Sequence, residues 1–448
     1  MFGKQKKIQP ILCCSPGEPI QSPDGVGQCS VLTGTVTGHI YAWEGNKVKF
    51  TVTAHESAVF AICKLRRGYA TAGKDGMIKL WSNKLQLIHS YNMQSNKPAP
   101  FSFSCHSLCA NKLSTRVAVG MKGGEIYEFS LPTHSRVLLI EGHSYRECHG
   151  LATNPVVGDE YATIGDDGIL RIWSYKLRMC LRRVAVEAAS RAICYSPDGQ
   201  NIIVGLGGDP TQSTKDGAFM VICSDNLEIM AEDRKAKLHI TDIKFSPDGQ
   251  IMAMTSADGK CYLHDAKTNA YLRTINLPSK SAVQATKVDF SNNGDLVRVS
   301  TSDEEMFHFN ADSGDVITAP LDMRDIEWHT NSCPYTWNSQ GYWLPTPLNN
   351  NIISVTLDSR KTLAAVAYQS GMVRLYRFPI QTYFAEVRFV PITGIATQAH
   401  SIRFSSDGRY LVCLDAYTRA VTQYTLRPIV PEAAPVMNKK KGSQVSSL

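Results

Sequence analysis

Apolar and polar residues alternate along most of the chain in short segments, and one seven-residue pattern returns nine times. Each copy opens on a turn pair such as Asp-Gly, alternates apolar with polar positions, and ends on a large ring or aliphatic residue. The copies occupy residues 37–43, 75–81, 123–129, 167–173, 216–222, 258–264, 303–309, 370–376 and 418–424. Asp and Gly tolerate the backbone angles of a tight turn, and period-two alternation predicts a strand with one buried face. Nine copies spaced by roughly 40 to 50 residues predict a β-propeller with one four-stranded blade per copy.

A second turn, upstream of the seven-residue pattern, supports the same architecture. Ser-Pro-Asp-Gly occurs at residues 196–199 and again at 246–249, and relaxed versions stand at 291–294 and 405–408. In each case an apolar strand ending in an aromatic residue reaches the turn and a second apolar strand leaves it. Proline presets the first turn angle, and glycine takes the position with positive φ.

The predicted fold class is therefore all-β: a WD-type β-propeller of eight blades, with one additional partial blade at the N-terminus. We expect three regions along the chain. Residues 1–48 form a basic segment with the partial blade, residues 49–427 form the eight-bladed propeller, and residues 428–448 form a disordered basic tail. The tail prediction follows from its small and polar composition.

Histidine, aspartate and tryptophan recur at matched positions, which invites comparison with a catalytic set. His55 precedes Asp75 and Trp81, and His143 precedes Asp166, Asp167 and Trp173. Catalytic residues would be unique to one blade, whereas these repeat. We interpret them as hydrogen-bond ladders that satisfy buried polar groups inside WD-type blades.

Other catalytic or cofactor signals are weak, and we predict that the protein is not an enzyme and has no cofactor. No GxSxG, HExxH or kinase motif is present. The glycine-rich segment 205–209 lacks the Lys-Ser/Thr that closes a phosphate loop. The nearest approach to a metal site is Cys105 and Cys109 with His106 and His149, but without a paired CxxC we favour core packing for these side chains.

A tryptophan-rich insert interrupts the spacing between the copies at 303–309 and 370–376. It covers residues 325–347 and contains Trp328, Trp337 and Trp343, half of the six tryptophans. Such a cluster either forms a partner surface, because tryptophan dominates binding hot spots, or fills a gap between blades. We favour the second role. Three lysines on the tail, Lys439, Lys440 and Lys441, are candidates for contact with an acidic polymer surface.

The charge and hydropathy of the chain bear on its partners. The formal net charge is +7, which favours acidic partners such as tubulin surfaces, nucleic acid or anionic lipid. No dense basic run with interleaved aromatic residues suggests nucleic-acid binding. No stretch is apolar for the roughly 18 residues that a membrane span needs, and no signal-peptide core follows the basic N-terminus. We therefore expect no nucleic-acid or membrane partner, and a cytoplasmic, cytoskeletal location.

Two blade openings and the insert together resemble the echinoderm microtubule-associated protein-like family. The openings are Thr-Ala-His-Glu at 53–56, leading to Val-Phe-Ala-Ile-Cys at 59–63, and Arg-Gly-Tyr-Ala-Thr-Ala-Gly-Lys-Asp-Gly at 67–76. Met-Arg-Asp-Ile-Glu-Trp at 323–328, followed by Gly-Tyr-Trp-Leu-Pro at 341–345, is similar to the signature insertion of that family. The resemblance covers about residues 7–426.

The resemblance implies two closely packed propellers, of which this chain would hold the last blade of the first and the whole second. It also implies association with microtubules. The chain departs from the longer members, since it shows no coiled-coil heptads, no hydrophobic HELP motif and little of the first propeller. In those members, these parts support trimerisation and much of the tubulin contact.

Together these observations predict a non-catalytic, microtubule-associated scaffold that contacts tubulin or neighbouring microtubule proteins through its propeller loops. The finer expectation is a component of the axoneme of a cilium or flagellum. The alternative is a soluble propeller adaptor that recruits a signalling or ubiquitin-ligase complex, because the fold alone does not decide between binding roles.

Overall fold

The computed structural model describes residues 9–17, 19–22, 25–28, 31–93, 104–143, 146–209, 214–278, 283–319, 323–343, 351–381, 389–394 and 397–427. In these ranges the secondary structure is dominated by antiparallel strands, with one short 3-10 helix, η2 (Trp337–Tyr342). Within the same ranges, no helix has the length and apolar character required to cross a membrane. The all-β, propeller-type fold class predicted from the sequence is confirmed.

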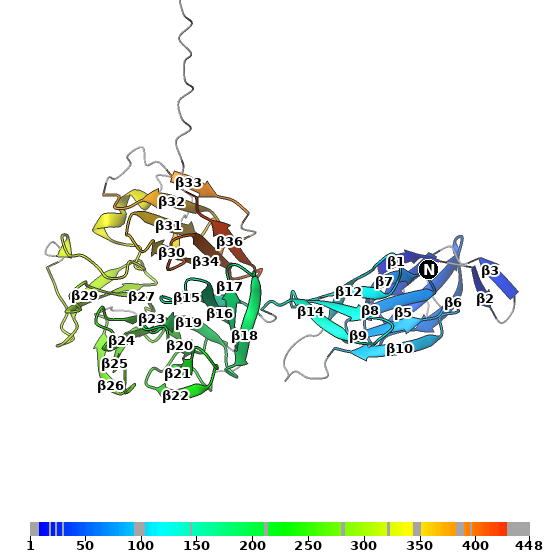
Figure 1. Ribbon diagram of the computed structural model, residues 1–448, viewed down its shortest axis with the longest axis horizontal. Coiled ribbons are helices and arrows are strands. Elements are labelled where there is room, and N and C mark those ends of the chain that lie inside the picture. Colours follow the sequence, from blue (N-terminus) through cyan, green and yellow to red (C-terminus); the bar gives the residue numbers. More distant parts are fainter. Residues whose placement is uncertain are drawn as a thin grey trace, which may run out of the picture.

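Three four-stranded sheets form the first part of the structure (Figure 1). A hairpin of β2 (Pro19–Ser22) and β3 (Gly25–Gln28) is inserted into the first of them. The strands of the three sheets are β1 (Ile11–Pro16), β4 (Val31–Thr35), β5 (His39–Glu44) and β6 (Lys47–Thr53); β7 (Val59–Leu65), β8 (Gly68–Gly73), β9 (Met77–Trp81) and β10 (Leu87–Asn92); and β11 (Cys105–Ala110), β12 (Arg116–Met121), β13 (Ile126–Ser130) and β14 (Arg136–Ile140). We call these three sheets the N-terminal stack.

Six further sheets of three or four strands follow, and we call them the ring. Their strands are β15 (Cys148–Thr153), β16 (Glu160–Gly165), β17 (Ile169–Ser174) and β18 (Met179–Ala185); β19 (Ser190–Tyr195), β20 (Asn201–Leu206), β21 (Ala218–Cys223) and β22 (Ile229–Arg234); β23 (Ile240–Phe245), β24 (Ile251–Ser256), β25 (Lys260–Asp265) and β26 (Tyr271–Asn276); β27 (Ala285–Phe290), β28 (Leu296–Thr301) and β29 (Met306–Asn310); β30 (Ile352–Leu357), β31 (Leu363–Tyr368), β32 (Val373–Arg377) and β33 (Phe389–Ile392); and β34 (Ala399–Phe404), β35 (Tyr410–Asp415) and β36 (Val421–Thr425).

The turns that join the strands follow the sequence signals. In the turn at 196–199, the backbone N–H of Gly199 donates to the carbonyl of Ser196 at 2.9 Å. Gly199 has a φ of 72°, a conformation that costs glycine little because it has no Cβ. The turns at 246–249, 291–294 and 405–408 repeat the same backbone hydrogen bond. The sequence predicted each of these turns.

The cores lie between neighbouring sheets rather than within one central mass. One cluster joins the first two sheets through residues such as Leu32, Val59 and Trp81. A larger one joins the sheets of β15–β18 and β19–β22 through a set of aliphatic residues that includes Ile172 and Val204. This is the packing that a propeller requires, since each blade buries both of its faces against its neighbours.

Closure of the ring is made by its first and last sheets. Strand β15 packs against β34 and β35, and the backbone N–H of Cys148 donates to the carbonyl of Ala416 at 3.1 Å. The Gln423 side-chain amide donates to the carbonyl of Tyr175 at 3.0 Å. Tyr175 and Tyr410 stack with their ring centroids 5.0 Å apart.

The grouping of the blades corrects one expectation from the sequence. The described residues form nine sheets of three or four strands, one for each copy of the seven-residue pattern, but the closing contacts start the ring at β15 rather than at residue 49. The two sheets expected in that ring from residues 49–140 pack instead with the first sheet, since β7 contacts both β1 and β11. That first sheet has four strands and is a full blade. The pattern specifies a blade but not the ring to which a blade belongs.

Candidate functional site

A hydrogen-bond ladder connects the matched histidine, aspartate and tryptophan of the second sheet. The imidazole Nδ1 of His55 lies 3.0 Å from the carboxylate of Asp75, and its Nε2 lies 2.8 Å from the hydroxyl of Thr71. Trp81 donates its indole N–H to the same hydroxyl at 2.8 Å. A neutral imidazole with its proton on Nδ1 satisfies all of these contacts. The ladder inferred from the sequence is confirmed, and Thr71 is the connecting residue that the sequence analysis missed.

The first sheet of the ring carries the same ladder. His143 contacts Asp167 at 3.0 Å and Thr163 at 2.8 Å, and the indole N–H of Trp173 donates to Thr163 at 2.7 Å. Of the two aspartates left open by the sequence, Asp167 is therefore the ladder member. Both ladders lie inside blades, so their histidines hold the fold together rather than contact a substrate.

A buried cation extends the ladder of the ring. Arg171 donates to Asp167 at 2.8 Å and to Glu141 at 3.2 Å. Burial favours the neutral form of Asp167, but the charges and hydrogen bonds of His143 and Arg171 outweigh burial and hold its pKa well below the usual range. Burial lowers the pKa of His143, and Arg171 opposes its protonation further.

One mouth of the ring axis is a cavity of about 350 Å³. Each of the six inner strands carries a β-bulge near its start, where one extra residue interrupts the pairing with the next strand. All six extra residues line this cavity: His149, Arg191, Thr241, Thr286, Ile353 and His400. The bulges thus direct one side chain from every blade into the same space. The sequence analysis singled out only His149 among them, and as a possible metal ligand rather than as a residue of this cavity.

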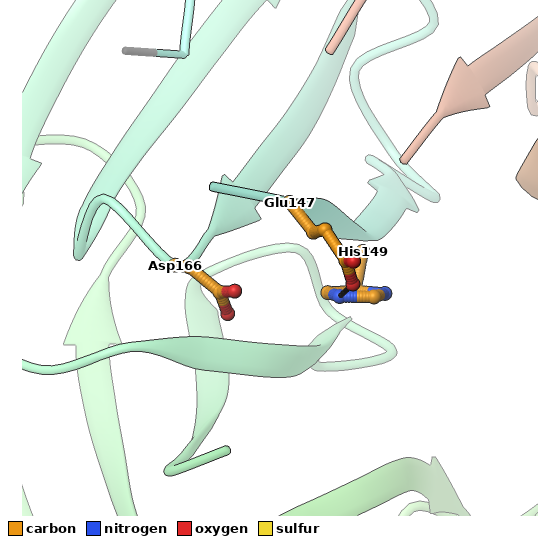
Figure 2. Close-up of side chains that lie close together, drawn as sticks. All are labelled: Glu147, His149 and Asp166. Atoms are coloured by element: carbon orange, nitrogen blue, oxygen red, sulfur yellow. Dashed lines mark ion pairs between the residues drawn. The ribbon is translucent and has the colours of Figure 1, made fainter. Parts of the chain in front are cut away.

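Three potential metal ligands lie close together (Figure 2), and one of them, His149, lines this cavity. Glu147 and His149 come from the start of β15, and Asp166 comes from the turn between β16 and β17; their ligand atoms lie within 4.8 Å of one another. Glu147 Oε2 is 3.0 Å from His149 Nε2, although that nitrogen lacks hydrogen-bond geometry to it. This set differs from the cysteine-histidine set weighed from the sequence. In the cysteine-histidine set, Cys105 is buried in the core of the N-terminal stack, whereas Cys109 is exposed.

The tryptophan-rich insert bridges the sheets of β27–β29 and β30–β33. Ser291 pairs with Trp328 in an isolated bridge, and Lys361 donates to the carbonyl of Trp328 at 2.8 Å. Further along the insert, the hydroxyl of Tyr368 donates to the carbonyl of Tyr342 at 2.7 Å. The insert therefore fills the space between two blades, as the favoured reading of the sequence expected.

A buried ion pair fixes the insert to β27. Asp289 accepts from Arg298 at 2.9 Å and from the backbone N–H groups of Ser332 and Cys333 at 2.8 and 2.9 Å. The guanidinium of Arg298 stacks 4.2 Å from the centre of the Trp328 ring. Such cation–π contacts gain strength when they are removed from water. Trp328 is only 5% exposed, so its ring belongs to the core of the molecule.

The other two tryptophans of the insert are more accessible. Trp337, at the start of η2, is 38% exposed. Trp343 is partly buried and stacks on Tyr335 with ring centroids 5.0 Å apart. The remaining candidates for partner contact, Lys439, Lys440 and Lys441, lie outside the described residues.

Comparison with known families identifies the ring. A family model described as the second beta-propeller of echinoderm microtubule-associated protein matches residues 148–426. The chain belongs to the echinoderm microtubule-associated protein family. The match starts at the first residue of β15 and ends just after β36, so it agrees with the ring boundary set by the closing contacts. A model of the WD domain, G-beta repeat, also matches residues 46–82 in the N-terminal stack.

Curated relatives support the same membership of the echinoderm microtubule-associated protein family. Echinoderm microtubule-associated protein-like 3 of Mus musculus is 24% identical over 95% of this chain and 46% of its own length. The like-2 protein of Rattus norvegicus is 24% identical over 85% of this chain and 55% of its own length. The like-1 protein of Rattus norvegicus is 22% identical over 95% and 49%. The chain thus spans about half the length of the curated relatives it matches.

Proposed function

We propose that this protein is a non-catalytic scaffold that associates with microtubules. The observation that carries the proposal is the match of the whole ring to the second propeller of a microtubule-associated protein. The relatives reported above are also microtubule-associated protein-like proteins by name. In the two complete ladders, the polar side chains that could suggest catalysis are engaged with one another, which supports a structural role for them.

The contact with tubulin, or with neighbouring microtubule proteins, is assigned in this proposal to propeller loops and to exposed parts of the insert. The net charge of +7 favours an acidic filament surface. Trp337 is the most exposed tryptophan of the insert, and Lys439, Lys440 and Lys441 add charge close to the C-terminal end. Trp343 has a smaller accessible part, and Trp328 supports the surface from beneath. An axonemal position in a cilium or flagellum is the finer form of the proposal.

Co-sedimentation with microtubules tests the proposal directly. The protein is expected to pellet with microtubules at low salt and to pellet less at moderate salt, because screening weakens contacts between exposed charges. Replacing the three tail lysines by glutamine is expected to reduce the pelleted fraction several-fold at low salt, and Trp337→Ala to reduce it at both salt concentrations. Arg409→Gln, a change at a side chain 75% exposed on a blade turn, serves as the control with one less charge.

Extraction of cells with detergent separates this proposal from an adaptor role. A microtubule scaffold stays with the extracted cytoskeleton and is released when the microtubules are depolymerised. A tagged protein that washes entirely into the soluble fraction, and fails to pellet with microtubules at low salt, contradicts the proposal and favours a soluble adaptor. A tagged protein that is spread through the cytoplasm and does not follow the microtubules would also contradict the proposal.

A further inference from the structure

The cavity at the mouth of the ring axis is lined by an unusual number of basic nitrogen atoms. Five of its lining residues are His149, Arg191, His239, Lys287 and His400. They come from five successive inner strands, counted around the closure from β34 through β15, β19 and β23 to β27, with His239 in the loop directly before β23. Much of the remaining lining consists of threonine, serine, asparagine and glutamine side chains, which are able to donate hydrogen bonds.

Carboxylates compensate these groups only in part. Glu304 is the acidic residue among the lining side chains, and it is exposed. Asp166 lies 3.5 Å from Arg191, too far for a good hydrogen bond, so the Arg191 Nε is buried without one. The Lys287 ammonium has no ion-pair or hydrogen-bond partner among the described residues. The nearby carboxylate of Asp242 contacts the ammonium of Lys244 instead, at 3.3 Å.

Burial is the main reason that the histidines of this cavity stay neutral, and neighbouring basic groups add to its effect. Burial, followed by the charges of His400, Arg191, His239 and Lys287, lowers the pKa of His149 to about 2. Burial, with Lys287 and Arg191, lowers the pKa of His400 to about 4. Burial and neighbouring cations also lower the pKa of Lys287, although Asp242 opposes the shift. Arg191 and Lys287 are therefore the charged basic side chains of the lining, and a bound anion would neutralise their charge.

A metal ion at Glu147, His149 and Asp166 is the competing occupant (Figure 2). A neutral imidazole and two carboxylates are suitable ligands for a divalent transition metal. A cation placed there, however, would lie beside Arg191 and in the field of Lys287, both of which would repel it. The overall charge of the surroundings therefore favours an anion.

We propose that the cavity is a binding site for a small phosphate-bearing anion. The planar guanidinium of Arg191 suits two oxygens of one phosphate group, and Lys287, which lines the same cavity, provides a point charge. His149 and His400 act as neutral N–H donors, and the hydroxyl groups of the lining supply further hydrogen bonds. With a volume of about 350 Å³, the cavity accommodates one or two linked phosphate groups. The site adds a function to the proposed microtubule contact, and Pro334 and Tyr335 of the insert also line it.

Calorimetric titration of the full chain with inorganic phosphate and with inorganic pyrophosphate tests the site. Both are expected to bind the wild-type protein, pyrophosphate more tightly, and ADP is added to learn whether a nucleoside is tolerated beside the phosphates. Arg191→Gln and Lys287→Gln are each expected to raise the Kd for pyrophosphate at least about tenfold, since each removes a charge-assisted contact. Arg409→Gln removes an exposed arginine from the same ring and is expected to leave the Kd unchanged.

Glu147→Gln distinguishes an anion from a metal. It removes a negative charge at the cavity, so it is expected to tighten pyrophosphate binding, whereas it would weaken binding of a metal ion by removing a ligand. Thermal unfolding shows whether each variant is folded. Because Arg191→Gln and Lys287→Gln test the site independently, one of them still tests it if the other does not fold. The proposal is overturned if neither phosphate nor pyrophosphate binds the wild-type protein. It is also overturned if Zn²⁺ alone binds and is lost in Glu147→Gln and Asp166→Asn.

Discussion

The ladder of the N-terminal stack and the ladder of the ring share four residue types but differ in a fifth. Four residues after the aspartate, the stack has Lys79 and the ring has Arg171. Lys79 reaches past the aspartate and donates to the carbonyl of Ala54. Arg171 turns back onto Asp167 and also contacts Glu141. The residue at this position thus decides whether the carboxylate of the ladder is paired with a buried arginine.

The difference also changes how strongly each blade depends on its aspartate. The Asp75 side chain is 9% exposed, and the Asp167 side chain is fully buried. A buried charge is costly without its partner, because water no longer solvates it. The repeat therefore fixes the geometry of a ladder, while the residues around it decide how much stability each member contributes.

The largest difference between the ladders is expected when the aspartate is removed. Asp167→Ala leaves the buried Arg171 without its main partner, and we expect a loss of roughly 3–5 kcal/mol in stability. Asp75→Ala removes hydrogen bonds but strands no buried arginine, and a loss of roughly 1–2 kcal/mol is expected. Hydrogen exchange over β15–β18 and over β7–β9 measures each blade separately, which suits a protein with more than one cooperative unit. Equal losses of protection in both variants would break the comparison.

Acid is expected to affect the ring more than the stack. Burial, with neighbouring cations, lowers the pKa of His149 to about 2 and that of His400 to about 4, whereas an unfolded chain takes up protons below about pH 6.5. The unfolded state then binds more protons, so the stability of the ring falls as the pH falls from 7 to 5, by up to about 2 kcal/mol for each histidine that stays neutral.

The stack provides the internal reference for this pH effect. Burial raises the pKa of Asp75, but its interactions with His55 outweigh burial and lower that pKa. The stability that Asp75 contributes is therefore lost only as the pH falls below about 4. His106 shifts in the same direction as the ring histidines but is exposed and contributes little. Hydrogen exchange at pH 7 and pH 5, corrected for intrinsic rates, follows both parts in one sample. His149→Gln is expected to reduce the pH dependence of the ring, and an unchanged dependence would refute the assignment.

The sequence predicted the blades well because their signals are local. The copy of the seven-residue pattern at 167–173 contains its own turn, its own strand and the ladder members Asp167 and Trp173. The ring boundary could not be predicted in this way, since the contact between Cys148 and Ala416 joins residues far apart in the chain. Strand β11 in the stack and strand β15 in the ring begin with similar patterns, and only the packing of the last blade distinguishes them.

The axial cavity escaped prediction for a related reason. A β-bulge shifts the alternation of apolar and polar positions by one residue, so His149 and Arg191 cannot be assigned to a face by counting along the strand. The bulges become evident only when the pairing registers of the six inner strands are compared. The insert, by contrast, could be located because it lengthens the spacing between the copies at 303–309 and 370–376. The ion pair of Asp289 and Arg298 that fixes it has no sequence signature.

Removal of the ladder threonine is expected to affect both ladders equally. Thr71→Val and Thr163→Val preserve shape but delete the hydroxyl that contacts both the histidine and the tryptophan. The hydroxyl distances agree within 0.1 Å between the two ladders, and the cation is not involved. A loss of roughly 1–2 kcal/mol is expected in each, read from hydrogen exchange of β8 and β16. A much larger loss in the ring would mean that Arg171 is coupled to Thr163. The contacts of the threonine and those of the arginine would then not contribute independently to stability.

The smallest effect is expected in the first sheet, where part of the ladder is present. Trp43 donates its indole N–H to Thr33 at 2.8 Å, the same contact that Trp81 makes with Thr71, but no histidine contact to Thr33 is found in the described residues. Thr33→Val therefore removes one described side-chain hydrogen bond rather than two, and a loss of about 1 kcal/mol or less is expected. Hydrogen exchange of β4 and β5 measures it, with Thr71→Val as the matched control. If Thr33→Val costs as much as Thr71→Val, the tryptophan contact carries the stability of the ladder, and the histidine and aspartate add little to it in the stack.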